Sequence, residues 1–372
     1  MSSKLLLGFL SLAAVAGVGT LAGWRVEAGQ TGAGSEYKAL APIRQGNLTI
    51  FPIVAAASHD TEQFLTLDEG LRSGEVEVTE AGRISPLIRR RPPQAMPGIW
   101  QENPRDGSRG AEVNKLVLVN NAKRPLLLLA GEVVTGGKQD RVIGKDRLVP
   151  AESDPIDLSV FCVEPGRWVG ATGKFGPMNS AMAAPAVRGS AMGYADQNRV
   201  WSEVRKAQAA VVARAPAPVA RELASTSSYA GVMENKEVLK QIDSVAAPMD
   251  NSYRSLIKEL KERNAVGVVV AVNGQIIWAD IFASTQLLQK YWPKLVRSYA
   301  AEAITAATKR NEVSEKSAQA FLENLDGRRQ TIENEPGLYR HTEVSGDNFK
   351  AFALTSLLPK TGFDLHIAKM AD

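Results

Sequence analysis

Residues 266–282 read VGVVVAV-NG-QIIWADIF, and this stretch decides the class of fold. Two apolar runs flank the dipeptide Asn273-Gly274. A two-residue type I′ turn needs positive φ at both central positions, and asparagine and glycine adopt positive φ more readily than other residues. The stretch therefore predicts a β-hairpin, which places antiparallel strands in the second half of the chain.

Other strand patterns lie on both sides of this hairpin. In the first half they are short runs that alternate or are continuously apolar, at residues 47–54, 75–79, 115–119, 126–130, 141–149 and 156–163. Runs 115–119 and 126–130 fit a hairpin of buried strands, and 141–149 with 156–163 fit a second pair. Closing strands are expected at 338–344, 349–354 and 363–368.

Helical spacing of apolar residues predicts a helix with Val200, Trp201, Val204 and Ala207 on one face, and helices at 236–245 and 252–263. Two more are expected to begin near Ser284 and at Ser314, whose hydroxyls can cap a helix. A strand-rich part followed by helices and terminal strands indicates an α+β fold. We expect a β-rich N-terminal half with antiparallel strands and a helix-rich C-terminal half that holds the hairpin and the terminal strands.

The N-terminus has the pattern of a targeting segment. Lys4 precedes an uncharged apolar run at 5–24, and Val26-Glu27-Ala28 offers small residues for cleavage, so we predict a signal peptide over 1–28. The run is also long enough for an uncleaved membrane anchor. In either case the body faces the extracytoplasmic side, as a periplasmic, secreted or membrane-anchored protein.

Composition subdivides the remaining chain. We expect a linker over 29–45 and one domain over 46–370, made of a β-rich half 46–172, an irregular Met/Gly/Ala-rich loop and linker 173–232, and an α+β half 233–370. Long irregular segments are commonly either disordered or functional. Residues 173–197 are therefore a candidate contact for a protein partner.

Charge and rare residues exclude several classes of function. A net charge of +4, from 44 basic and 40 acidic residues, does not indicate a nucleic-acid binder. The single cysteine cannot form an internal disulfide, and three scattered histidines give no zinc spacing. Only a metal held by carboxylates, such as Glu132, Asp140 and Glu164, is compatible with the sequence. We assign no metal or cofactor.

Two polar turns carry most of the chemically active side chains. The first reads Gly136-Gly137-Lys138-Gln139-Asp140-Arg141, and the second, Glu164-Pro165-Gly166-Arg167-Trp168, follows a strand that ends at Cys162-Val163. Both turns follow strands, so we expect them to meet at one sheet edge. The cations and glycine amides suit an anion, and Trp168 suits a stacked base. The alternative is a buried tryptophan covered by Arg167.

Three side chains near these turns are candidate catalytic groups. Glu132 and Glu164 can act as acid and base in a hydrolysis, or form structural ion pairs with Arg141 and Arg167. Cys162 is either a nucleophile activated by a neighbouring cation or a small buried hydrophobe of the strand.

These motifs, in this order, resemble one family. Gly131-Glu132, residues 136–141 and residues 162–168, with the hairpin 266–282 and the helix at 292–303, are similar to the domain named for its association with ADP-ribosylglycohydrolases and rhodanese-phosphatases. The resemblance covers about 46–366. It implies association with ADP-ribose and NAD processing, and the family pattern has Asn where this chain has Asp140.

We therefore expect an exported protein that binds an anionic small molecule, ADP-ribose-like or otherwise phosphate-bearing, with hydrolysis as a possible extension. The alternative is a non-enzymatic cell-envelope protein that contacts a partner through residues 173–197.

Overall fold

The computed structural model describes residues 37–80, 115–166, 174–259, 263–307, 309 and 311–372. By its contacts the chain divides into two units, Met1–Gly32 and Ala33–Asp372, and all described residues belong to the second. The predicted signal peptide and the first part of the predicted linker lie outside the described residues. None of the helices in the described part combines the length and the apolar composition that a membrane span needs.

The largest sheet is antiparallel and contains the predicted hairpin. β13 (Ala265–Val272) and β14 (Gln275–Phe282) are joined by Asn273 at φ 55° and Gly274 at φ 78°, as a type I′ turn requires. The strand order is β1-β3-β13-β14-β18-β17-β16-β15, with β2 also paired to β3. The remaining strands are β1 (Tyr37–Ala39), β2 (Ile43–Gln45), β3 (Leu48–Ala55), β15 (Arg328–Glu335), β16 (Tyr339–Ser345), β17 (Phe349–Ser356) and β18 (Asp364–Ala371).

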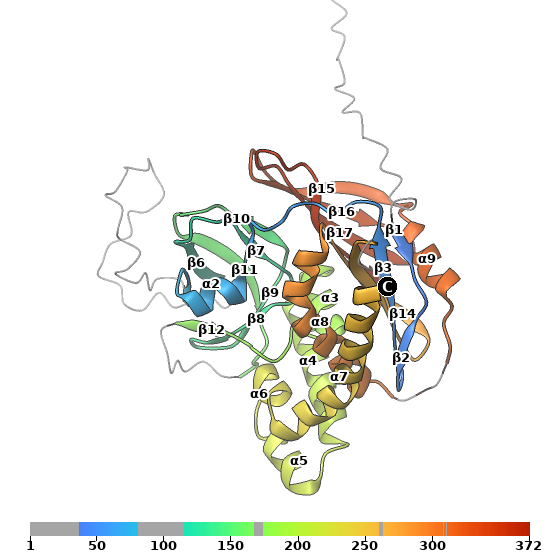
Figure 1. Ribbon diagram of the computed structural model, residues 1–372. Helices are drawn as coiled ribbons and strands as arrows, with labels where there is room; N and C mark the ends of the chain where they lie inside the picture. Colours follow the sequence, from blue (N-terminus) through green and yellow to red (C-terminus); the bar gives the residue numbers. More distant parts are fainter. Residues whose placement is uncertain (1–36, 81–114, 167–173, 260–262, 308, 310) are drawn as a thin grey trace, which may run out of the picture. The chain divides into compact units, whose positions relative to one another are not determined.

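Helices cover both faces of this sheet, and β13 is consequently buried along its whole length. On one face Val268 and Val270 join the main hydrophobic core, to which α7 (Lys236–Glu259) and α8 (Thr285–Thr305) contribute. On the other face Val269 packs in a second cluster with residues of α9 (Glu315–Glu323). α7 and α8 lie side by side (Figure 1).

Two smaller sheets come from the first half of the chain. One has the order β12-β8-β9-β11-β6-β5, and the other, β10-β7-β4, includes the parallel pair β4–β7. Some of their buried side chains form a core cluster of their own, whereas Leu127, Val133, Val142, Leu148 and Phe161 join the main core. The strands are β4 (Leu65–Thr66), β5 (Val76–Glu80), β6 (Lys115–Asn120), β7 (Leu126–Leu128), β8 (Val133–Gly136), β9 (Arg141–Ile143), β10 (Arg147–Val149), β11 (Ile156–Cys162) and β12 (Phe175–Pro177).

The α+β class is confirmed, with β16, β17 and β18 close to the predicted closing strands. Ser284 and Ser314 cap α8 and α9 as expected. The predicted hairpin of 115–119 with 126–130 is wrong, because β6 pairs with β5 and β11 whereas β7 pairs with β4 and β10. A continuously apolar strand is buried on both faces, so its pattern does not specify its neighbour.

The segment 173–232, predicted as loop and linker apart from one helix around 200–207, is largely helical. It contains α3 (Pro185–Met192), α4 (Gln197–Val212), α5 (Ala217–Ala224) and α6 (Tyr229–Met233). Pro185 and Pro216 stand at the starts of α3 and α5, where the missing N–H costs nothing, rather than marking irregular chain. The methionines of this segment, Met178, Met182 and Met192, are buried in the main core.

Two further differences concern the helices. The predicted pair 236–245 and 252–263 is one helix, α7, which continues through Pro248. A helix that the strand patterns did not predict, α2 (Leu67–Ser73), follows Thr66, whose side chain and Glu69 form a capping box. The spacing Thr66-x-x-Glu69 is the sequence signal for such a start.

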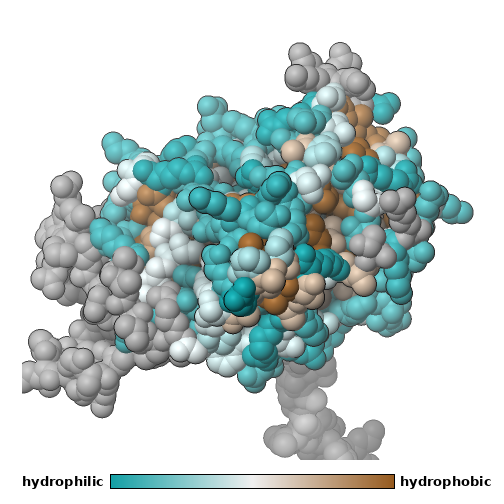
Figure 2. All heavy atoms as spheres, turned by 90° about the horizontal axis from the view of Figure 1, so that it is seen from below, coloured by the Kyte–Doolittle hydropathy of each residue, from teal (hydrophilic) through white to brown (hydrophobic). Residues whose placement is uncertain are grey.

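Hydrophilic residues cover most of the face in Figure 2, and hydrophobic residues show between them in small areas. In the described part of the chain, Tyr194 and Ile332 are the large hydrophobic side chains with substantial exposure, at 39% and 41%. Tyr194 lines a cavity described below, and Ile332 belongs to the edge strand β15.

Candidate functional site

The predicted turn at 136–141 has a glycine-dependent geometry. Gly136 and Gly137 have φ values of 127° and 53°, and a Cβ on Gly137 would come within 2.3 Å of the Phe175 ring. No other residue fits there without displacing Phe175. The Gly136 amide donates to Oδ1 of Asp140 over 3.1 Å, so the carboxylate closes the turn on itself.

The first predicted turn contacts the described part of the second, residues 164–166. The Asp140 amide donates to Oε2 of Glu164 over 3.1 Å, and Nε2 of Gln139 donates to the Glu164 carbonyl over 3.1 Å. Oδ2 of Asp140 accepts from Ser228 Oγ over 2.7 Å, which ties the turn to the start of α6. Arg167 and Trp168 lie outside the described residues.

Burial shows what this cluster does. Gln139, Asp140, Arg141 and Glu164 are each at most 6% exposed. Burial lowers the pKa of Arg141, while the neighbouring Cys162 and the acidic groups Glu80, Asp140 and Glu164 act in the opposite direction. Lys138 is half-buried, and its amide donates to Oε1 of Glu80 over 2.7 Å. The described groups of this cluster bond to one another, as expected for an internal network that fixes two turns.

Cys162 has the properties of a buried strand residue. It is fully buried, and its backbone N–H and C=O are both bonded to the amide side chain of Gln197, over 2.9 and 2.8 Å. Burial raises the pKa of its thiol. A nucleophilic cysteine requires a lowered pKa and access to solvent, so these features disfavour the thiolate hypothesis.

Glu132 lies in a different cluster from Glu164. It is 1% exposed, and its Oε2 accepts from the Leu129 amide over 2.8 Å. Burial raises its pKa to about 8, and its charged neighbours are Lys294, Asp68 and Asp146. The expected carboxylate pair of Glu132 and Glu164 is therefore divided between two environments.

A buried ionic chain was not expected from the sequence. Arg188 on α3 contacts both oxygens of Asp280 on β14, with N–O distances of 2.8 Å. His366 on β18 bonds through Nε2 to Asp280 over 3.0 Å and through Nδ1 to Asp146 over 2.5 Å. Tyr299 on α8 donates to Asp280 over 2.5 Å. All five side chains are fully buried.

Electrostatic interactions within the buried ionic chain stabilise the charged forms of its side chains. Burial alone would lower the pKa of His366, but the carboxylates of Asp146 and Asp280 raise it. Burial alone would raise the pKa of Asp280, but Arg188 and His366 hold it low. With His366 protonated, two cations balance two carboxylates, which is the condition for burying charge without a large penalty. No spacing in the sequence links these residues, since they come from five separate segments.

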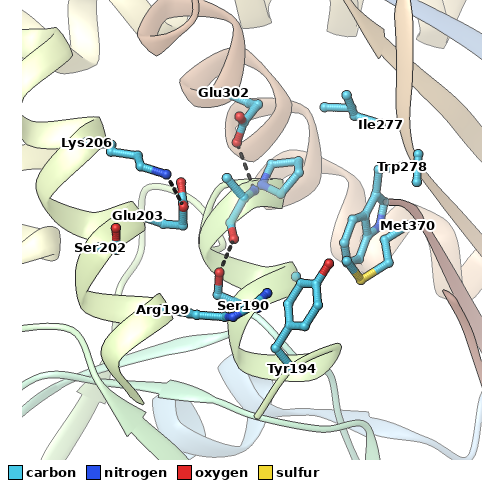
Figure 3. Close-up of a pocket in the computed structure, with 14 residues that line it drawn as sticks. Ser190, Tyr194, Arg199, Ser202, Glu203, Lys206, Ile277, Trp278, Glu302 and Met370 are labelled. Carbon is cyan, nitrogen blue, oxygen red and sulfur yellow. Dashed lines mark hydrogen bonds and ion pairs between the residues drawn. The ribbon is translucent and has the colours of Figure 1, made fainter. Parts of the chain in front are cut away.

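A solvent-accessible cavity lies elsewhere, between α3, α4, α8, β14 and β18 (Figure 3). We call it the α4 cavity, and its volume is about 540 Å³. It is lined by Pro185, Ala186, Gly189, Ser190, Tyr194, Arg199, Ser202, Glu203, Lys206, Ile277, Trp278, Glu302, Met370 and Ala371.

Opposite walls of the α4 cavity differ in chemistry. Arg199, Ser202, Glu203 and Lys206 project from successive turns of α4 on one side, and Trp278 and Met370 lie on the other (Figure 3). The floor is the small-residue face of α3, where a Cβ on Gly189 would lie 3.3 Å from the Met370 methyl.

Charges in the cavity are only partly paired. Lys206 forms an ion pair with Glu203 over 2.7 Å, whereas the Arg199 guanidinium lies 4.0 Å from the centre of the exposed Tyr194 ring. Glu302 accepts from the Ala186 amide over 3.0 Å. Burial, and to a lesser degree Glu203, raises the pKa of Glu302. The polar face of α4 has the pattern of any solvated helix face, so no pattern in the sequence predicts this site.

No group of three or more His, Cys, Asp or Glu side chains in the described part of the chain is arranged to hold a metal ion. A family model described as the ARG and Rhodanese-Phosphatase-superfamily-associated Protein domain matches residues 36–368. The match spans the turn cluster, the ionic chain and the α4 cavity, except Met370 and Ala371 of its lining. No curated protein and no solved structure matches the chain.

Proposed function

We propose, from the premise that this chain belongs to the ARG and Rhodanese-Phosphatase-superfamily-associated Protein domain family, that it binds a small anionic molecule in the α4 cavity. The observation that carries the proposal is a cavity with Arg199 and the Lys206–Glu203 ion pair on one wall and an aromatic and thioether surface on the other. Its volume of about 540 Å³ falls among those of small-molecule sites.

The cationic wall sets the class of ligand. Arg199 and Lys206 are seven residues apart, two turns along one face of α4, so an anion between them can contact both. Arginine is suited to bidentate contact with phosphate or carboxylate. Met370, Ile277 and Trp278 give an apolar part of the same ligand a surface to pack on.

ADP-ribose-like molecules are the first candidates within this class. Reading "ARG" in the family description as ADP-ribosylglycohydrolase leads to ligands that combine two phosphates with a flat base. Such a ligand matches both walls of the α4 cavity. The described groups of the turn cluster at 136–141 support it less, since they are buried among themselves.

Isothermal titration calorimetry with ADP-ribose, NAD and inorganic phosphate tests the proposal. Because a charge-assisted hydrogen bond contributes about 1.5–3 kcal/mol, Arg199→Ala should weaken binding about ten-fold or more. Lys206→Ala should act in the same direction. Arg205→Ala is the matched control, since Arg205 is exposed on the same helix and does not line the cavity. Absence of heat with all three ligands, or equal affinity in all variants, would contradict the proposal.

Hydrolysis is a second function that the cavity supports. Burial, and to a lesser degree the negative charge of Glu203, raises the pKa of Glu302, and a carboxyl group with a raised pKa is a candidate general acid. Glu132, Glu164 and Cys162 do not line the cavity. Chromatography of ADP-ribose and NAD after incubation should show products that Glu302→Gln abolishes while retaining binding. If ADP-ribose and NAD are recovered unchanged, hydrolysis of these ligands is contradicted and binding remains the proposed function.

The remaining proposals concern location and partners. Export rests on the apolar segment at 5–24, and mass spectrometry of the mature N-terminus distinguishes cleavage after Ala28 from an anchor. An envelope protein that contacts a partner through 173–197 has less support, because Met178, Met182 and Met192 of that segment are buried.

A further inference from the structure

We propose that β15 pairs with the β15 strand of a second copy of this chain, antiparallel and across a two-fold axis. β15 is the last strand of the largest sheet, and β16 is its one partner among the described strands. Seven of its eight residues are exposed, and Ile332 near its centre is 41% exposed. A strand of this length and exposure presents unpaired backbone groups that favour pairing with another strand.

A β-bulge in β15 gives the strand the facing that antiparallel pairing with the β15 strand of a second copy requires. Pairing with β16 shifts by one residue between Thr331 and Glu333. Arg328, Gln330, Glu333 and Glu335 consequently lie opposite Ser345, Glu343, His341 and Tyr339, which are alternate residues of β16. Residues opposite alternate positions share one face of a sheet. A two-fold axis between Thr331 and Ile332 then places Arg328 opposite Glu335 of the second copy, on the same face, as antiparallel pairing requires.

The charges of β15 fit this orientation and no parallel one. The strand begins with Arg328-Arg329 and ends with Glu333-Asn334-Glu335. In the antiparallel pair each arginine end meets an acidic end, which is a favourable cross-strand contact. A parallel pair would place arginine against arginine. Edge charges that protect a strand from pairing usually repel any added strand, whereas these repel only in one orientation.

Arg328 and Glu335 are the residues available for the contact. Glu333 is already bound to Lys145 through an ion pair of 2.6 Å. Arg328 bonds only to the neutral side chain of Gln330, over 2.8 Å, within the described part of the chain. Glu335 is exposed. Two symmetric Arg328–Glu335 pairs therefore form without breaking an existing ion pair.

Sedimentation velocity of the full chain over a concentration series tests the proposal. The native chain should form a reversible dimer. Arg328→Glu or Glu335→Arg alone should weaken it about ten-fold, because two attractive pairs become repulsive. The double variant R328E/E335R should restore dimerisation with reversed polarity, and a mixture of the two single variants should form the mixed dimer.

Arg205→Glu on α4 changes the net charge as Arg328→Glu does and should leave the dimer unchanged. A native chain that is monomeric at every concentration would overturn the proposal, as would a dimer that the single variants do not weaken or the double variant does not restore. The outcome is independent of ligand binding in the α4 cavity, because none of these residues lines it.

Discussion

At the scale of single residues, burial separates side chains that hold the fold from those that can meet a ligand. The cations and carboxylates that the sequence groups at 136–141 bond to neighbouring turns, whereas Arg199 is exposed and stacks on Tyr194. Residue type alone therefore could not locate the site, and exposure decides between the two roles.

The effect of burial on the Glu132 carboxyl can be tested through the pH dependence of the free energy of unfolding. Its pKa is raised from 4.5 to about 8, so the folded state binds its proton more tightly than the unfolded state. The contribution of Glu132 to stability is complete below pH 4.5 and is lost as the pH rises towards 8. Over this window the free energy of unfolding should fall by about 1.4 kcal/mol per pH unit through this group.

Glu132→Gln should remove that dependence and make the protein more stable than the native chain near pH 8. Glutamine retains the oxygen that accepts from the Leu129 amide. Urea denaturation between pH 5 and 8 measures the effect, with exposed Glu62→Gln as the control. Parallel pH profiles for native chain and Glu132→Gln would show that the carboxyl is ionised in the folded state.

At the scale of elements, local sequence signals predicted individual pieces and tertiary pairing was beyond them. Asn273-Gly274 predicted the hairpin and Ser284 the start of α8, because each signal acts within a few residues. The partners of β6 and β7 and the continuity of α7 through Pro248 depend on packing between distant segments. The α4 cavity depends on it too, since its walls come from five elements, α3, α4, α8, β14 and β18.

The N-cap of α8 combines a local hydrogen bond with a contact to a distant segment, and substitution of Ser284 tests the contribution of both. Oγ of Ser284 accepts from the Leu287 amide over 3.0 Å and lies 2.6 Å from Oγ1 of Thr61, and both residues are buried. Ser284→Ala removes the cap and leaves Thr61 without this partner, so we expect a loss of about 2 kcal/mol.

Ser314 caps α9 with the same geometry but is exposed. Ser314→Ala should cost only about 1 kcal/mol, since water can replace the lost acceptor. Chemical denaturation of the two variants measures the difference. Equal losses would mean that the contact with Thr61 adds nothing to the cap.

At the scale of the whole described unit, the buried ionic chain joins segments that the sequence keeps far apart. Asp146 accepts from the Ala130 amide over 2.7 Å in the first half, and Arg188, Asp280, Tyr299 and His366 belong to α3, β14, α8 and β18. Arg188 also lies 4.7 Å from the centre of the Trp278 ring, which lines the α4 cavity. The buried ionic chain thus connects the smaller sheets, the largest sheet and the wall of the α4 cavity.

His366 is the central link, and its replacement tests the network as a whole. His366→Gln leaves Asp146 and Asp280 buried without the imidazolium, so we expect a loss of about 3–5 kcal/mol. Since the pKa of His366 is raised above 6.5, its stabilisation is complete below that pH and is lost as the pH rises through the folded value. The difference in unfolding free energy between native chain and variant should therefore be largest at pH 6 and shrink towards pH 9. The exposed His59→Gln is the control. A difference that stays constant over this range would show that His366 is neutral in the folded protein and that the network is held by hydrogen bonds alone.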